Sequence, residues 1–525
     1  MAAKRVSLPS SEERHIEFKE KLLSSVHLRS ERRQHLATQM KSKLNEGNGL
    51  AVYLLGVTDD GDPLGLSDIE LEESLAVLRS IATEVGAVID RIERYEGERG
   101  AIAKVIIKSY TPITKRHIVV AVAGHVNHGK STLIACLMTG QPDDGRKWLY
   151  LDTLPHEIER NLSADLHFAL LGFKDGRPIL MKNPLDKSEK IKVASMADKL
   201  LSFVDTVGHE PWLRTTIRGL VGQEVDYGLL IVAADDGPTH ITKEHLGIML
   251  ALGLPIIVCI SKIDKVSMER RVEVRDEVSR LLKRVGRVPL LIKDRNDIEL
   301  VIDKMNIVVP IIETSSVTLS GYEHLYDLLS MLPARSKSID QPFLLYIDRV
   351  YNIEGVGSVV SGSIMQGKLK AGSDLLIGPD PKGVFRPVKA RSIEMHYTRV
   401  AEAEAGYIVG IAIRGINHEE IRRGMVLCDA SLMPRAVWSF KADLLILTHP
   451  TRVANGYEPV LHCHTISQTV KLKLIDREYL KPGEQGEVIM EFKYSPCLIR
   501  EGDKFVIREG RTKGIGQVTK ILRYA

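Results

Sequence analysis

The chain has 525 residues, of which 44% are hydrophobic and 27% are charged, and its formal net charge is +4. This length exceeds what one hydrophobic core supports, so three or four domains are expected. The mildly positive charge is compatible with RNA binding but does not by itself indicate it, and DNA is not expected as a partner. No apolar run approaches membrane-spanning length, and the first residues lack the apolar segment of a signal peptide.

The cysteines are scattered along the chain, and no two of them form a CxxC pair. This usage predicts reduced, mostly buried thiols in a cytoplasmic protein. The five residues are Cys136, Cys259, Cys428, Cys463 and Cys497.

Residues 1–115 are predicted to form an N-terminal α+β domain. Helical patterning covers 13–23, 32–44 and 68–85, and Asp68 is the expected cap of the last helix. Strand-like patterning covers 50–57, which follows the first two helices, and also 88–92 and 101–110. A charged turn at 96–100 separates the last two segments.

Two groups of charged residues in this domain could serve a function, although both are also compatible with an ordinary solvated surface. Five basic residues could contact a phosphate backbone, although a solvated helix face is the simpler interpretation. They are Arg29, Arg32, Arg33, Lys41 and Lys43. Five acidic residues could hold a metal, although surface solvation explains paired acids as well. They are Glu12, Glu17, Glu20, Asp59 and Asp60.

The segments Ile16–Lys19 and Leu55–Gly61, which contain several of these acids, resemble the core pattern of Schlafen/AlbA-type domains. Some Schlafen-type domains cleave RNA with carboxylate-bound metal, so the resemblance implies a metal-dependent nuclease as one alternative.

The segment GHVNHGKS fits the phosphate-loop pattern G-x-x-x-x-G-K-[ST]. An apolar strand, 118–123, precedes it, and apolar residues at helical spacing follow it. Glycines let the backbone N–H groups point at phosphate oxygens, Lys130 can reach the β- and γ-phosphates, and the Ser131 hydroxyl can hold Mg²⁺. The predicted nucleotide-binding residues are Gly124, His125, Val126, Asn127, His128, Gly129, Lys130, Ser131 and Thr132.

From 117 to 335, strand-like and helical segments alternate, which predicts an α/β P-loop domain with a parallel sheet. Ligand-binding residues belong at the carboxyl ends of such strands. Asp205 follows one strand and could support Mg²⁺, and the N–H of Gly208 could meet a γ-phosphate.

Two further strand ends carry residues suited to a guanine base. In Ser261–Asp264, the carboxylate of Asp264 could accept the guanine N1–H and N2–H groups, and Lys262 could lie on the base plane. After the last strand, backbone N–H groups of Ser315, Ser316 and Val317 could meet the guanine O6.

Together, GHVNHGKS, DTVGH, SKID and TSSV resemble the GTPase motifs of translation factors of the elongation factor Tu type, and segment 235–245 is similar to the same family. Nearly the whole chain resembles the GTP-binding protein one and two family, through segments 46–53, 156–159 and 508–513 as well. The resemblance implies two β-barrel domains after the GTPase domain, at 343–430 and 432–525, beyond a linker at 333–342. Short alternating strands with glycine-rich turns agree with this expectation.

The resemblance also implies roles. His209 would orient the attacking water, Ser131, Ser163 and Asp205 would hold Mg²⁺, and the cluster 508–513 would lie near bound tRNA. Three positions depart from the family pattern: Asn127 replaces aspartate, Val207 replaces proline, and Ser261 replaces asparagine. The last change is expected to remove part of the hydrogen bonding between the base-binding loops.

We therefore expect a GTPase that binds GTP and Mg²⁺ and acts as a switch. The expected partners are the ribosome and aminoacyl-tRNA or another RNA, and the expected process is aminoacyl-tRNA delivery or mRNA surveillance. A nucleotide-gated binding module with a vestigial GTPase is an alternative, beside the nuclease. His462 and His464 flank Cys463, but they lack a second pair of ligands, so an ordinary strand is the preferred interpretation.

Overall fold

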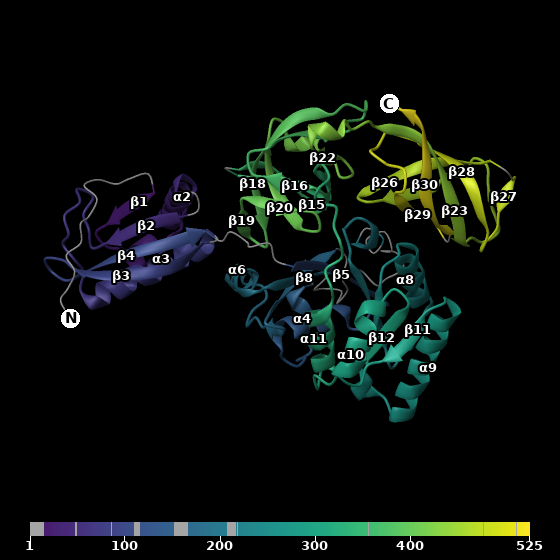
Figure 1. The fold of residues 1–525 in the computed structure, drawn as a ribbon, viewed down its shortest axis with the longest axis horizontal. Coiled ribbons are helices and arrows are strands. Elements are labelled where there is room, and N and C mark those ends of the chain that lie inside the picture. The colour runs from purple at the N-terminus through teal and green to yellow at the C-terminus, as the bar shows by residue number, and fades with distance from the viewer. Residues whose placement is uncertain are drawn as a thin grey trace. The chain divides into compact units, whose positions relative to one another are not determined.

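The structure is a computed structural model, and it describes residues 15–47, 50–85, 87–109, 116–151, 166–206, 217, 219–354, 356–475, 477–510 and 512–525 (Figure 1). Contacts divide the chain into two compact units, which are described separately below. The first contains Met1–Thr114, Asp186–Ser195 and Glu394–Ala401, and the second contains Lys115–Leu185, Met196–Ile393 and Glu402–Ala525. In the described ranges, no helix is both long and apolar enough to cross a membrane.

The N-terminal domain is a four-stranded sheet of order β1-β2-β4-β3 with helices packed on one face. Alternate residues of β2 and β4 point to that face, where they meet the apolar sides of the two long helices. The α+β prediction is confirmed. The elements are β1 (Ile16–Lys19), α1 (Ser24–His27), α2 (Ser30–Glu46), β2 (Leu50–Leu55), α3 (Asp68–Glu84), β3 (Ala87–Glu96) and β4 (Ala101–Ser109).

Two local predictions in this domain are wrong. Segment 13–23 was expected to be helical, but its described part contains β1, which pairs in parallel with β2. The cap of α3 is Ser67 rather than Asp68, because the Ser67 hydroxyl accepts the N–H of Glu70 at 3.4 Å.

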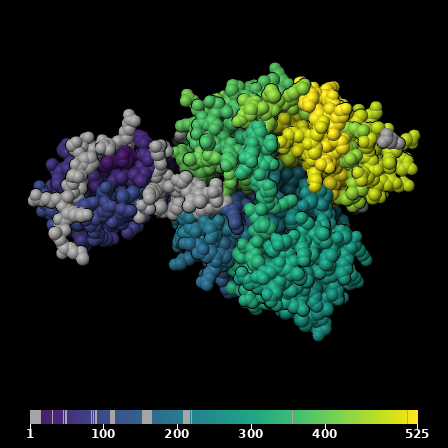
Figure 2. Space-filling view, in the orientation of Figure 1, coloured from purple at the N-terminus to yellow at the C-terminus, as the bar shows by residue number. Residues whose placement is uncertain are grey.

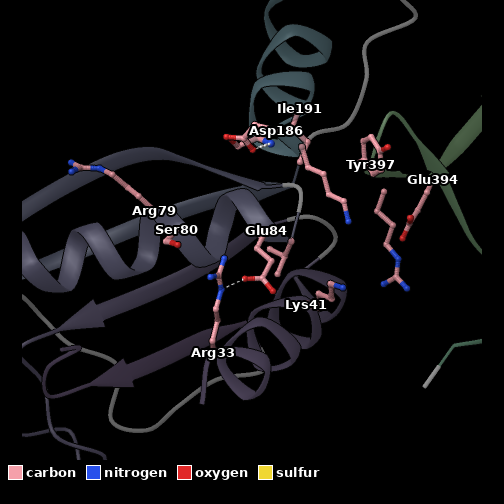
Figure 3. Close-up of a pocket in the computed structure, with 13 residues that line it drawn as sticks. Arg33, Lys41, Arg79, Ser80, Glu84, Asp186, Ile191, Glu394 and Tyr397 are labelled. Atoms are coloured by element: carbon pink, nitrogen blue, oxygen red, sulfur yellow. Dashed lines mark hydrogen bonds and ion pairs between the residues drawn. The ribbon is translucent and has the colours of Figure 1, made fainter. Parts of the chain in front are cut away.

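The basic cluster of this domain is partly neutralised. Arg33 on α2 donates to Glu84 on α3 at 2.7 Å (Figure 3), and Lys43 forms an ion pair with Glu17 at 3.0 Å. These pairs favour the simpler interpretation of a charged helix surface over a phosphate-binding one.

The α/β domain of the second unit contains an eight-stranded sheet of order β11-β12-β10-β9-β5-β8-β6-β7. Six neighbouring strands are parallel, and at one edge β6 pairs antiparallel with β8 and β7 pairs antiparallel with β6. The central strand β5 leads into the phosphate loop. The strands are β5 (Arg116–Gly124), β6 (His167–Lys174), β7 (Arg177–Ile179), β8 (Lys199–Asp205), β9 (Tyr227–Ala233), β10 (Ile256–Ser261), β11 (Val288–Leu291) and β12 (Val308–Glu313).

Helices cover both faces of this sheet. Alternate residues of β5, including Val119 and Ala121, share one core with α8 and α9, whereas α4 packs on β5, β6 and β8. This arrangement confirms the predicted α/β class and places the carboxyl ends of β5, β8, β9 and β10 at one edge. The helices of this domain are α4 (Lys130–Thr139), α8 (His240–Ala251), α9 (Met268–Arg284), α10 (Arg295–Val301) and α11 (Tyr322–Met331), whereas α6 (Lys187–Met196) belongs, as far as Ser195, to the first unit.

Two β-barrels follow, as the sequence predicts. In the first, the path β13-β22-β17-β18-β21-β15 closes because β13 also pairs with β15, and β14 lies beside β15. Its strands are β13 (Leu344–Tyr346), β14 (Arg349–Ile353), β15 (Gly357–Gln366), β17 (Asp374–Gly378), β18 (Arg386–Met395), β21 (Ile408–Arg414) and β22 (Val426–Cys428).

The second barrel is closed in the order β23-β28-β26-β25-β29-β30. Residues of β13 and β22 belong to its core, so the green and yellow surfaces adjoin in Figure 2. Its strands are β23 (Val437–Thr448), β25 (Val460–Cys463), β26 (Ile466–Leu474), β28 (Gln485–Phe492), β29 (Lys504–Glu509) and β30 (Thr512–Tyr524).

Candidate functional site

The phosphate loop connects the central strand β5 to helix α4, and its two glycines meet different requirements. A Cβ atom on Gly124 would lie 2.4 Å from the carbonyl oxygen of Ile231 on β9, so the close approach of the two backbones requires glycine. Gly129 has open space around it, but its φ of 84° as the N-cap of α4 is left-handed. The loop therefore curls into the N-terminus of a helix, which is a suitable site for phosphate.

The cation and the hydroxyl of the loop lie where the sequence predicts them. Lys130 is buried, and its Nζ donates to the carbonyl of His125 at 3.1 Å across the loop. The Ser131 hydroxyl donates to the Asp205 carboxylate at 2.7 Å. Asp205 ends β8, the neighbour of β5, so adjacent strand ends bring together a hydroxyl and a carboxylate that suit a hard cation.

Asn127 adopts a φ of 60° within the loop. Asparagine and aspartate tolerate this left-handed conformation better than most residues with a side chain. The replacement of the family's aspartate is therefore compatible with the backbone of the loop.

Ser261 makes a contact that the sequence did not predict, because its hydroxyl donates to the carbonyl of His128 at 2.7 Å. The expected loss of hydrogen bonding between the base-binding loops concerns other partners and stays a prediction. The end of β10 is thus tied directly to the phosphate loop.

The remaining base-binding candidates lie in the adjoining loops. Lys262 has a φ of 59° and forms an ion pair with Asp235 at 3.3 Å, and Asp264 is exposed in the short turn that follows. Burial raises the pKa of the Asp235 carboxyl, but Lys262 outweighs this effect and the pKa is lowered overall. This pair positions Lys262 beside the loop after β9.

The loop after β12 supplies the third set of candidates. The N–H of Ser315 donates to the carbonyl of Ser320 at 3.1 Å, and the carbonyl of Ser316 accepts the N–H of Asp143 at 2.8 Å. Because the Ser315 amide is engaged within the loop, the amides of Ser316 and Val317 are the better candidates for a contact with guanine O6.

Ser163, Gly208 and His209 lie outside the described residues, so their predicted roles in metal, phosphate and water binding stay predictions.

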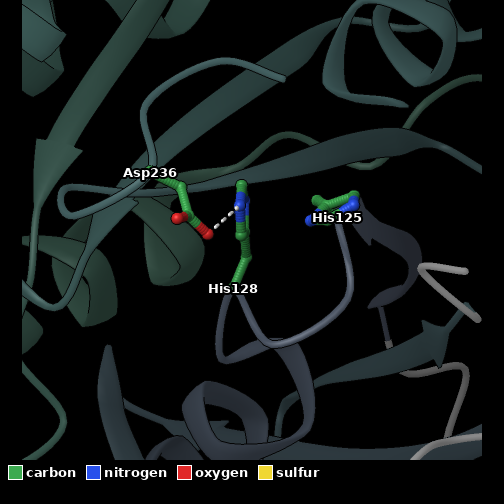
Figure 4. A group of neighbouring side chains, drawn as sticks. All are labelled: His125, His128 and Asp236. Carbon is green, nitrogen blue, oxygen red and sulfur yellow. Dashed lines mark ion pairs between the residues drawn. The ribbon is translucent and has the colours of Figure 1, made fainter. Parts of the chain in front are cut away.

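The sequence placed His128 among the nucleotide-binding residues but assigned no role to its neighbours Asp236 and His245. His128 is fully buried, and its Nε2 lies 3.3 Å from the carboxylate of Asp236, which follows β9 (Figure 4). Burial lowers the pKa of His128 to about 4, and burial likewise lowers that of His245 on α8 to about 3, so both rings are neutral at pH 7. The position of Asp235 and Asp236 at a strand end was the available clue.

The acidic residues of the N-terminal domain do not form a metal centre in the described part of the chain. Glu17 is buried and lies 2.6 Å from Lys19 and 3.0 Å from Lys43, and no group of three metal-binding side chains is found there. Glu12 lies outside the described residues. The nuclease alternative is not favoured, because two lysines already neutralise its central carboxylate.

One expectation about the second barrel needs correction. His464 is not on the strand of His462 but in the turn after β25, where it lies 3.2 Å from Asp503. Lys513 in the cluster 508–513 is buried and forms an ion pair with Glu244 on α8, and the expected position of this cluster near tRNA stays a prediction. Arg511 lies outside the described residues. All five cysteines are free and buried, as expected.

Comparisons with known proteins agree with this architecture. The elongation factor Tu GTP-binding domain family matches residues 115–334, the elongation factor Tu domain 2 family matches 357–428, and the elongation factor Tu C-terminal domain family matches 433–522. Together these matches account for the α/β domain and the two barrels.

Individual relatives extend the match to the N-terminal domain. GTP-binding protein 1 of Xenopus laevis is 32% identical over 94% of this chain and 77% of its own. GTP-binding protein 2 of Homo sapiens is 32% identical over 98% of this chain and 88% of its own. Elongation factor 1-alpha of Methanothermobacter thermautotrophicus is 31% identical over 76% of this chain and 90% of its own.

Solved structures share the fold. A bacterial selenocysteine-specific elongation factor, EF-Sec, aligns with a TM-score of 0.58 and 23% identity, over 77% of this chain and 58% of its own. Translation elongation factor SelB of Methanococcus maripaludis, in complex with a GTP analogue, aligns with a TM-score of 0.56 and 21% identity, over 78% of this chain and 80% of its own. Given the phosphate loop, the two barrels and these relatives, the chain belongs to the elongation factor Tu-like GTPases, in the family of GTP-binding proteins 1 and 2, and is a translation-factor-type enzyme that binds and hydrolyses GTP.

Proposed function

We propose that Ser131 and Asp205 hold the Mg²⁺ of bound GTP, with Ser163 joining them in the GTP state. The observation that supports this most directly is the 2.7 Å bond between the Ser131 hydroxyl and the Asp205 carboxylate, because both are oxygen ligands of the kind Mg²⁺ prefers. The bound ion would neutralise charge on the phosphates.

The nucleotide would lie along the edge where β5, β8, β10 and β12 end. The phosphate loop, Gly124 to Thr132, would surround the phosphates, and the N–H of Gly208 would meet the γ-phosphate. Asp264 would accept two hydrogen bonds from guanine, Lys262 would cover the base, and Ser261 would hold this loop against the phosphate loop. Guanine would be selected over adenine, because adenine lacks the paired donors.

Hydrolysis would proceed by in-line attack of water on the γ-phosphorus, giving GDP and inorganic phosphate. His209 would orient the water, and Lys130 would stabilise the charge that develops on the phosphate oxygens. Loss of the γ-phosphate would release Gly208 and Ser163, and the barrels would change position relative to the α/β domain.

The partners would be the ribosome as activator and an RNA, with aminoacyl-tRNA as the first candidate. Support comes from the similarity to elongation factor 1-alpha and from the fold shared with selenocysteine-specific elongation factors. The alternative of a binding module with a vestigial GTPase is less well supported, because Ser261 makes a bond between the base-binding and phosphate loops.

The test is GTP hydrolysis by the purified chain, alone and with ribosomes from its own source. We expect slow intrinsic hydrolysis that ribosomes accelerate, and we expect His209→Ala to bind GTP normally while losing at least about 100-fold of the accelerated rate. Equal ribosome-stimulated turnover by wild-type and His209→Ala proteins would refute the role of His209. Tight GTP binding without stimulation would refute the ribosome as activator.

A further inference from the structure

Three side chains beside the phosphate loop lie close enough to share one metal ion. His125 and His128 come from the phosphate loop, and Asp236 comes from the loop after β9 (Figure 4). One ligand atom from each lies within 4.8 Å of the other two. The two imidazole rings are 5.2 Å apart and meet edge to face at 66°.

Two of the three ligand atoms already have the spacing of a chelating pair. His128 Nε2 and Asp236 Oδ2 are 3.3 Å apart. Zinc ligands lie about 2.0–2.1 Å from the ion in tetrahedral geometry, which separates two such ligands by about 3.3 Å. The third ligand would come from His125, which is a partly exposed residue of a loop.

The surroundings of His128 allow a metal ligand in one of its two tautomers. Its Nδ1 lies 3.2 Å from the N–H of Ala233, which donates to it, and 3.3 Å from the carbonyl oxygen of Ile231. An ion on Nε2 requires the tautomer in which Nδ1–H donates to Ile231 instead. Metal-binding histidines usually donate their second N–H to a carbonyl or carboxylate in this way. The ring is fully buried against β9, which fixes its orientation without any ion.

The second group of metal-binding side chains in the described residues is less suitable. Cys463, His464 and Asp503 also lie within 4.8 Å of one another. However, Asp503 accepts the N–H of Arg500 at 2.7 Å and lies 4.0 Å from its guanidinium, and His464 is stacked 4.2 Å from the Tyr346 ring. The guanidinium of Arg500 and the ring of Tyr346 therefore already contact these candidate ligands.

We propose that His125, His128 and Asp236 form a binding site for a divalent transition-metal ion, with Zn²⁺ as the best match to two imidazoles and one carboxylate. The fourth position is left for water, as in zinc sites with three protein ligands. This site is distinct from the proposed Mg²⁺ site, because its imidazole ligands suit zinc and copper rather than magnesium. A bound ion would tie the phosphate loop to the loop after β9.

The experiment measures Zn²⁺ binding by the full chain, stripped of metal with a chelator and freed of nucleotide, using isothermal titration calorimetry. Co²⁺ absorption reports the coordination number in parallel. We expect one tight equivalent of Zn²⁺ and a four-coordinate Co²⁺ spectrum. Asp236→Asn and His125→Gln should each weaken Zn²⁺ binding at least about tenfold, because even supporting residues around metal sites contribute that much.

Two variants serve as controls. Asp235→Asn changes the adjacent carboxylate, which pairs with Lys262 rather than with the histidines, and should leave Zn²⁺ affinity unchanged. His464→Gln alters the second group and should also bind Zn²⁺ normally. Asp236 is 53% exposed, so Asp236→Asn should fold, which circular dichroism verifies. No Zn²⁺ binding by the wild-type chain, or binding that survives both Asp236→Asn and His125→Gln, would overturn the proposal.

Discussion

At the scale of single residues, Ser261 shows how a departure from a family motif can make a contact of its own. Its hydroxyl donates to the carbonyl of His128 at 2.7 Å, and both residues are buried. We expect Ser261→Ala to weaken GDP binding about fivefold, because a lost neutral hydrogen bond costs about 1 kcal/mol. Equilibrium binding of a fluorescent guanine nucleotide measures the change.

The matched control for this prediction is Ser261→Asn, which introduces the residue of the usual translation-factor motif. It should bind GDP at least as well as wild type, since an amide N–H can also donate to the His128 carbonyl. The preference for guanine over adenine should persist in both variants, because Asp264 is unchanged. An unaltered affinity in Ser261→Ala would show that the bond does not support the site.

At the scale of whole elements, Lys199 fastens the last helix of the α/β domain to its sheet. Its Nζ donates to the carbonyls of Leu329, Ser330 and Leu332, at 2.9, 2.6 and 2.7 Å. These groups lie at the C-terminus of α11, where a cation is favourable for both the open carbonyls and the helix dipole. Lys199 therefore caps the end of a helix that is distant in sequence, because Leu329 follows it by 130 residues.

We expect Lys199→Met to lower the free energy of unfolding by about 2–3 kcal/mol, because buried carbonyls lose a charged donor. Denaturant unfolding measures this change, and GTP binding should persist in the folded variant. The control is Lys174→Met, which removes an exposed lysine from β6 in the same sheet. A stability equal to that of wild type would contradict the capping role.

The sequence predicts elements best where composition and periodicity agree. The apolar runs that became β8, β9, β10 and β12 were identified because buried parallel strands are nearly continuous in apolar residues. Strand β1 was missed because it contains only four residues, and one of them, Glu17, is buried by pairing with lysines from elsewhere. Ile69 belongs to the periodic segment 68–85 that predicted α3 but is 83% exposed, since periodicity alone does not show where packing stops.

The same limit applies to the candidate site. The phosphate loop and Asp205 were predictable because glycine, lysine and hydroxyl spacing reflects phosphate chemistry directly. The contact between Ser261 and His128, and that between His128 and Asp236, depend on which strand ends become neighbours. Those neighbours follow from the strand order, which the sequence does not state.

At the scale of the second unit, polar contacts connect the α/β domain to both barrels. The buried His117 on β5 contacts the Ser202 hydroxyl and the carbonyl of Gly406 at 2.9 Å each, which links the domain to the first barrel. Burial lowers the pKa of His117 to about 4, so the ring is neutral at pH 7 and can donate one bond and accept the other. On the other side, Lys513 on β30 reaches Glu244 on α8.

The pair of Lys513 and Glu244 leads to the last prediction. Both side chains are less than a tenth exposed, so removal of Glu244 leaves the buried charge of Lys513 without this partner, and removal of Lys513 leaves Glu244 with only the exposed His240, 3.0 Å away. We expect Lys513→Met and Glu244→Gln each to lower the free energy of unfolding by about 3 kcal/mol, and the double variant to lose clearly less than the sum. Scanning calorimetry measures the effect as a lower transition temperature.

The matched control is Lys504→Met, because Lys504 donates to the carbonyl of Ala251 at the end of the same helix from an exposed position, at 3.2 Å. Its loss should change stability by less than about 1 kcal/mol, since an exposed bond competes with water. If the Lys513 and Glu244 effects simply add, the two residues do not stabilise this junction as a pair. If Lys513→Met instead leaves stability intact but weakens RNA binding with a smaller salt dependence, the residue serves RNA after all, because each lost phosphate contact reduces that slope.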